Sequence, residues 1–101
     1  MEDKKIEELR YIENQLQHVL AQKQMLQLEM NEINNALGEL SHSDDEVYRI
    51  FSGIMIKSNK KNAVKELKER KNSMKMKIDS LEKQEDLLNK NSEELRDEIN
   101  Q

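Results

Sequence analysis

The chain has 101 residues, of which 38% are charged and 3% aromatic, and it carries a net charge of -4 with no cysteine and no proline. This composition excludes an ordinary globular core, a disulfide framework and a cysteine-based metal site. At this length we expect a single domain over residues 1–101. The start of the chain shows no signal peptide and no apolar run is long enough for a membrane span, so we expect the chain in the cytoplasm. Much Glu, Lys and Leu without proline is typical of long helices.

An apolar heptad predicts a first helix over about residues 3–40. The two seam positions hold Leu9, Leu16, Lys23, Met30 and Leu37, and Ile12, Val19, Leu26, Ile33 and Leu40. Only Lys23 interrupts the apolar stripe. So narrow a stripe indicates a coiled-coil seam rather than the broader face of a globular surface helix.

The central segment, about residues 47–57, breaks the heptad pattern. Apolar and β-branched residues flank Ser52-Gly53, a pair suited to a tight turn, and this arrangement predicts a β-hairpin. A lone two-stranded hairpin is marginally stable, and its unpaired apolar edges invite other strands. We therefore expect the hairpin to pair with hairpins of other subunits; a buried loop and a third short helix are the alternatives.

A second heptad predicts a helix over about residues 60–100, with Ser58 and Asn59 as candidate N-caps. Its seam positions hold Val64, Lys71, Ile78, Glu85, Ser92 and Ile99, and Leu67, Met74, Leu81, Leu88 and Leu95. Two helices of nearly equal length joined by a short module are expected to fold back on each other. The predicted fold is dominated by α-helix: a long antiparallel two-helix coiled coil joined by a β-hairpin, with a parallel dimer through the same stripes as the alternative.

Polar residues become denser in the seam toward the two chain termini. The antiparallel register places Lys23 opposite Leu81 and Glu85 opposite Val19. The seam is therefore expected to be loosest at the free end, here called the tip. The apolar residues of the tip are Ile6, Leu9, Ile12, Leu16, Leu88, Leu95 and Ile99. They are either simply part of the core or, when the tip loosens, a binding surface.

Charge divides the second helix into two parts. Residues 60–77 hold eight basic residues against two acidic ones, and residues 78–101 hold eight acidic residues against three basic ones. Most of these side chains are expected on a solvated helix face. The basic part is a candidate phosphate contact, although it lacks interleaved aromatic residues, and the acidic part is a candidate dock for a basic partner.

Nothing in the sequence points to catalysis. His18 and His42 have no acidic or histidine partner at ligand spacing, and two glycines are too few for a phosphate-binding loop. The carboxylates are expected on exposed helix faces, where nothing raises a carboxyl pKa for acid catalysis. We therefore expect no enzyme, no metal site and no cofactor.

Stretches of both helices and of the hairpin resemble the β class of the prefoldin family. The matching segments are 15–24, 27–29, 47–49, 54–57, 63–69 and 81–85. The resemblance extends over nearly the whole chain, and the single hairpin is similar to the β class rather than to the two-hairpin α class. The turn at Ser52-Gly53 comes about one residue later than in the family pattern, which leaves the strand register open.

The resemblance implies an ATP-independent co-chaperone, or holdase, which binds unfolded proteins at the coiled-coil tips and delivers them to a group II chaperonin. It implies a hetero-hexamer of two α subunits and four β copies, joined by hairpins in an inter-subunit β-barrel. The implied barrel residues are Val47, Tyr48, Ile50, Phe51, Ile54, Met55 and Ile56. The tip apolar residues would bind clients. The implied chaperonin contacts are Glu93, Glu94, Asp97 and Glu98.

Two other functions stay open. The first is a coiled-coil arm that binds nucleic acid through residues 60–77, and the second is a passive structural tether. The apolar hairpin argues against the first, because such an arm needs only a short turn between its helices.

Overall fold

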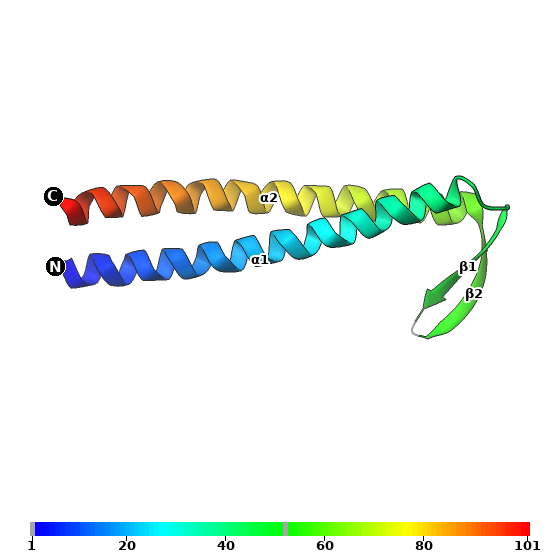
Figure 1. The fold of residues 1–101 in the computed structure, drawn as a ribbon, viewed down its shortest axis with the longest axis horizontal. Helices are drawn as coiled ribbons and strands as arrows, with labels where there is room; N and C mark the ends of the chain where they lie inside the picture. Colours follow the sequence, from blue (N-terminus) through cyan, green and yellow to red (C-terminus); the bar gives the residue numbers. More distant parts are fainter. Residues whose placement is uncertain (1, 52) are drawn as a thin grey trace. The chain divides into compact units, whose positions relative to one another are not determined.

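A computed structural model describes residues 2–51 and 53–101. Its elements, in chain order, are α1 (Glu2–Leu40), β1 (Glu46–Phe51), β2 (Ile54–Asn59) and α2 (Lys60–Asn100) (Figure 1). The expected order of helix, hairpin and helix is confirmed. The chain divides into two compact units: a terminal unit of Met1–Leu26 with Lys77–Gln101, and a hairpin unit of Gln27–Met76.

The seven-residue period decides which side chains of α1 and α2 are covered. Every heptad position predicted for the seam is buried or half-buried, while most residues between them are exposed. The most deeply buried side chains are Val19, Ile78, Leu81 and Ser92 in the terminal unit, and Ile33 and Met74 in the hairpin unit. A narrow covered stripe of this kind is the geometry of a coiled coil.

In the terminal unit the two helix segments run antiparallel. Four ion pairs among the described residues join them: Lys5–Glu98 at 3.6 Å, Glu13–Arg96 at 3.0 Å, Lys23–Glu85 at 2.9 Å and Lys23–Glu82 at 3.8 Å. As the residue number rises along α1, the number of its partner falls along α2. The helices therefore pair within one chain, as the antiparallel prediction requires.

Local hydrogen bonds fix the helix ends beside the hairpin. The Asn59 side-chain oxygen accepts a hydrogen bond from the Asn62 backbone N–H at 2.8 Å, which makes Asn59 the N-cap of α2. At the end of α1, the Ser41 hydroxyl donates to the Gly38 carbonyl oxygen at 2.6 Å. The Lys60 backbone N–H donates to the Asp45 carbonyl oxygen at 2.8 Å, which ties the start of α2 to the segment before β1.

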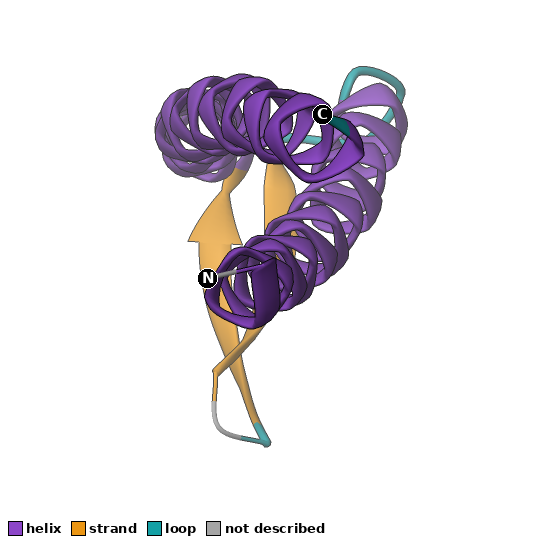
Figure 2. Cartoon of the chain, turned by 90° about the vertical axis from the view of Figure 1, so that its left-hand side faces the viewer, coloured by secondary structure: helices purple, strands orange, loops and turns teal. Residues whose placement is uncertain are grey.

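The strands β1 and β2 form an antiparallel two-stranded ribbon, drawn in orange in Figure 2. The register pairs Tyr48 with Lys57, Ile50 with Met55 and Phe51 with Ile54, so the loop has two residues. Gly53 takes a φ of 80°, a left-handed conformation that glycine adopts without strain. Ser52, the other turn residue, lies outside the described part of the chain.

Within residues 2–51 and 53–101, neither helix carries an apolar window long enough for a membrane span. The same described ranges contain no group of three His, Asp or Glu side chains that would hold a metal ion.

Candidate functional site

The hairpin exposes apolar side chains on both of its faces. Side chains alternate along a strand, so one face carries Tyr48, Ile50 and Met55, which are 61%, 73% and 65% exposed. On the other face, Ile54 and Ile56 are also exposed. Isolated exposed apolar residues are ordinary, but a contiguous group on a two-stranded ribbon with open edges indicates an interaction surface.

The remaining hairpin residues predicted for assembly differ from this group. Val47 is half-buried. The side chain of Phe51 lies outside the described part of the structure, although its backbone belongs to β1. We call the exposed group, Tyr48, Ile50, Ile54, Met55 and Ile56, the hairpin surface.

An ion pair connects the hairpin to α2 inside the hairpin unit. Arg49 Nη1 lies 2.7 Å from Glu66 Oε2, and both side chains are largely exposed. On the opposite face of the ribbon, Lys57 forms an ion pair with Glu46. Beside the ribbon, residues of α1, β1 and α2 line an open hollow of about 810 Å³, with Leu40, Val47 and Leu67 among them. The hollow offers room for a side chain from another molecule next to the hairpin surface.

The structure separates the tip residues into two kinds. Ile6 is exposed, whereas the others are half-buried in the seam. These half-buried residues are Leu9, Ile12, Leu16, Leu88, Leu95 and Ile99. Ser92, the polar residue expected to weaken the tip, is only 4% exposed, and its hydroxyl donates to the Asn89 carbonyl oxygen at 2.9 Å. A seam layer built on this serine has little apolar surface to hold it closed.

The sequence analysis missed exposed apolar residues of the terminal unit, among them Tyr11 and Leu87. Tyr11 and Leu87 are 65% and 60% exposed and lie outside the heptad seam. Tyr11 and Ile12 line a shallow hollow together with Lys4, Glu7 and Glu8. A search for apolar residues off the heptad, rather than on it, would have found both.

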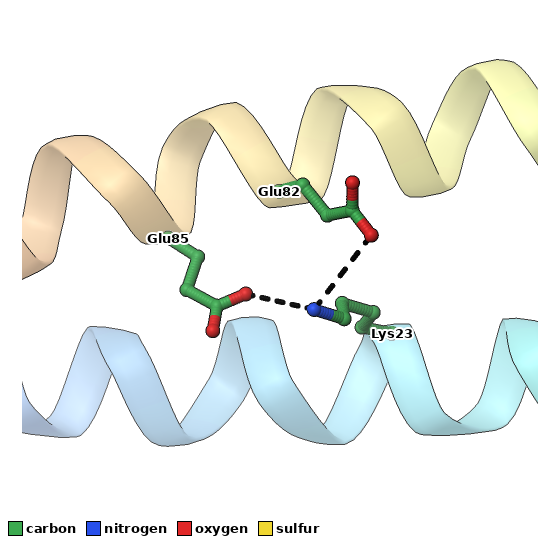
Figure 3. Close-up of polar contacts among 3 residues, drawn as sticks. All are labelled: Lys23, Glu82 and Glu85. Atoms are coloured by element: carbon green, nitrogen blue, oxygen red, sulfur yellow. Dashed lines mark hydrogen bonds and ion pairs between the residues drawn. The ribbon is translucent and has the colours of Figure 1, made fainter.

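A half-buried ion pair in the seam of the terminal unit was also missed. Lys23 Nζ lies 2.9 Å from Glu85 Oε2 and 3.8 Å from Glu82 Oε1, as Figure 3 shows. The hydrogen bond to Glu85 raises the pKa of the Lys23 ammonium above its ordinary value of 10.5. Lys23 and Glu85 both occupy seam positions, and such a pair disfavours shifted registers, in which each charge would meet apolar side chains.

The four acidic residues predicted at the C-terminal end lie in the last turns of α2. Glu93, Glu94, Asp97 and Glu98 are all exposed. Glu98 forms the ion pair with Lys5, while the other three form none with any residue that the structure describes. The acidic end thus keeps three carboxylates available to solvent.

Comparison with known proteins finds one family. The family model described as "Prefoldin subunit" matches residues 3–101. The chain is similar to the prefoldin subunit beta of Saccharolobus islandicus, with 35% identity over 92 residues that cover 89% of this chain and 73% of that protein. It is also similar to the prefoldin subunit beta of Caldivirga maquilingensis, with 33% identity over 98 residues, 95% of this chain and 81% of that protein.

A solved structure shows the same fold. The crystal structure of the prefoldin beta subunit from Thermococcus strain KS-1 matches with a TM-score of 0.90 and 35% sequence identity, over 97% of this chain and 88% of that one.

Proposed function

The chain belongs to the prefoldin family, whose members are chaperone subunits, and on that premise we propose that it is an ATP-independent holdase subunit. It assembles through its hairpin, binds unfolded proteins at its tip and delivers them to a group II chaperonin. The observation that carries the proposal is the presence of two features in one chain: an apolar hairpin surface, and a serine, Ser92, buried in the seam near the chain termini.

Exposure of the hairpin surface supports assembly. Its apolar side chains are 43% to 73% exposed, so a large part of their surface is left for burial against other subunits. In the proposed assembly these are other copies of this chain and an α-class prefoldin subunit, in a hexamer of two α and four β subunits. The hairpins then close into a β-barrel, which removes their open edges.

The tip supports client binding by a different argument. An unfolded protein presents apolar side chains in no fixed geometry, so its binding site needs apolar surface that adapts. Half-buried seam residues around a serine layer become available when the helices separate locally. Exposed Ile6 offers a first contact without any separation.

The test is suppression of aggregation of a chemically denatured client, without nucleotide, by the assembled particle. The tip variant Ile6→Ser/Ile99→Ser should lose protection while the mass of the particle stays unchanged. The matched control, Met25→Ser/Met76→Ser, removes two apolar residues that are 64% and 73% exposed but lie outside the tip. Equal protection by the tip variant and the wild type would refute tip binding.

Delivery to a chaperonin rests on the acidic end. Glu93, Glu94 and Asp97 are exposed carboxylates that steer a basic surface toward the tip over about a Debye length. Replacing all three by glutamine should slow association with a group II chaperonin, measured by surface plasmon resonance, and leave client protection intact. An unchanged association rate at low salt would exclude these residues.

A further inference from the structure

Four of the seven lysines in the basic part of α2 lie in one stripe. Lys61, Lys65, Lys68 and Lys75 follow one another at intervals of four, three and seven residues, which places them on one helix face. All four are exposed, and none forms an ion pair with any residue that the structure describes. We call them the basic stripe; they lie wholly within the hairpin unit.

The acidic part of α2 carries a stripe of the opposite sign. Asp79, Glu82, Asp86 and Glu93 follow at intervals of three, four and seven residues and are exposed. Glu82 lies 3.8 Å from the Lys23 ammonium, and the other three have no ion-pair partner among the described residues. These residues, the acidic stripe, lie wholly within the terminal unit.

Each stripe is repulsive by itself. Lysines at positions i and i+4, such as Lys61 and Lys65, repel each other on an exposed helix face, and so do Glu82 and Asp86. The neighbouring Lys83 and Lys90 form no ion pair with the acidic stripe, although the structure describes all of these residues. A surface of the opposite charge would relieve both repulsions.

We propose that the basic stripe of one copy docks against the acidic stripe of a second copy of this chain. The spacing supports this choice of partner. Lys61, Lys68 and Lys75 repeat every seven residues, and Asp79, Asp86 and Glu93 repeat at the same interval, about 10 Å along a helix. Two antiparallel helices therefore place Lys68 beside Asp86 while Lys75 meets Asp79 and Lys61 meets Glu93.

This contact is separate from hairpin assembly and goes beyond holdase function. It uses exposed helix faces and charge, whereas the hairpin surface is apolar. Exposed ion pairs weaken with salt, while apolar contacts do not. The docking therefore joins assembled particles to one another at low ionic strength, and it dissolves at high ionic strength without breaking the particles.

The experiment is sedimentation velocity of the assembled particle over a range of protein and salt concentrations. The mass at roughly 300 mM NaCl gives the particle alone, and between that salt and roughly 50 mM the association constant should rise about tenfold or more. The variants Lys68→Glu/Lys75→Glu and Asp79→Lys/Asp86→Lys should each lose the low-salt association. An equimolar mixture of the two variants should regain it, because each supplies the charge that the other has reversed.

The matched control is Glu29→Lys/Glu32→Lys, which reverses two exposed acidic residues of α1 outside both stripes and should associate as the wild type does. Far-ultraviolet circular dichroism checks that every variant keeps its helices. The proposal is overturned if the wild type shows no salt-dependent association, or if the mixture fails to restore it. If the basic stripe binds nucleic acid instead, the association would persist in the variant Asp79→Lys/Asp86→Lys without the second variant being added. That result would also overturn the proposal.

Discussion

Replacement of Ile50 by alanine tests whether the hairpin surface serves contacts outside the chain. Ile50 is 73% exposed, so its side chain contributes little to the stability of its own subunit. Full burial of an isoleucine side chain stabilises by about 1.5–3 kcal/mol, and most of that remains to be gained on assembly. Ile50→Ala should therefore weaken each hairpin contact by about 2 kcal/mol, or about thirtyfold in the association constant.

Light scattering coupled to size-exclusion chromatography measures this effect in a dilution series of the chain with an α-class partner. The thermal midpoint of the Ile50→Ala chain alone should differ from that of the wild type by less than about 4 °C, since surface substitutions usually change stability by less than about 0.5 kcal/mol. Met76→Ala is the matched control, because Met76 is also 73% exposed but lies on α2, away from the hairpin. Dissociation at the same concentration for wild type, Ile50→Ala and Met76→Ala would refute the assembly role.

Three further predictions concern the fold. Gly53→Ala should destabilise the hairpin by about 1 kcal/mol, because the φ of 80° is strained for any residue with a Cβ, and the dilution series above detects this as weaker assembly. Met74→Ala should lower the free energy of unfolding by about 2–4 kcal/mol in urea titration, because Met74 is 6% exposed, whereas Met76→Ala should leave it unchanged. The raised pKa of Lys23 means that its pair with Glu85 stabilises fully below pH 10.5 and that this contribution is lost as the pH rises through the folded-state pKa. In alkaline buffers, the thermal midpoint of the wild type should therefore fall more steeply than that of Lys23→Met.

The sequence predicts the order of helices and strands because the residue pattern of each kind of element has a distinct physical cause. A seven-residue apolar repeat can cover only a narrow stripe, and the structure covers that stripe in both helices. The hairpin follows from a two-residue turn between β-branched runs, and Gly53 in this turn takes a φ of 80°.

Side-chain reach accounts for what the heptad alone does not predict. Register assigns Lys23 a seam layer opposite Leu81, but the lysine stem is long enough to carry the ammonium one turn along α2 to Glu85.

Tyr11 and Leu87 were missed because a heptad search ignores apolar residues off the seam. The residues predicted to bind clients and a chaperonin stay predictions, because their partners determine those roles and the fold of one chain does not.

The hairpin surface shows that the fold of one subunit and its proposed assembly with other subunits place different requirements on the sequence. An isolated two-stranded ribbon is marginally stable, and here Tyr48, Ile50, Ile54 and Met55 are each more than 60% exposed. These side chains therefore add almost no apolar burial to the subunit, although β-branched and aromatic residues are what strands need to pair well. Local strand preference and the proposed burial between subunits favour the same residues, whereas the solubility of a lone subunit opposes them. A chain that kept only its coiled coil would fold with a polar loop in place of the hairpin, so the apolar ribbon is best explained by contacts that the single chain does not make.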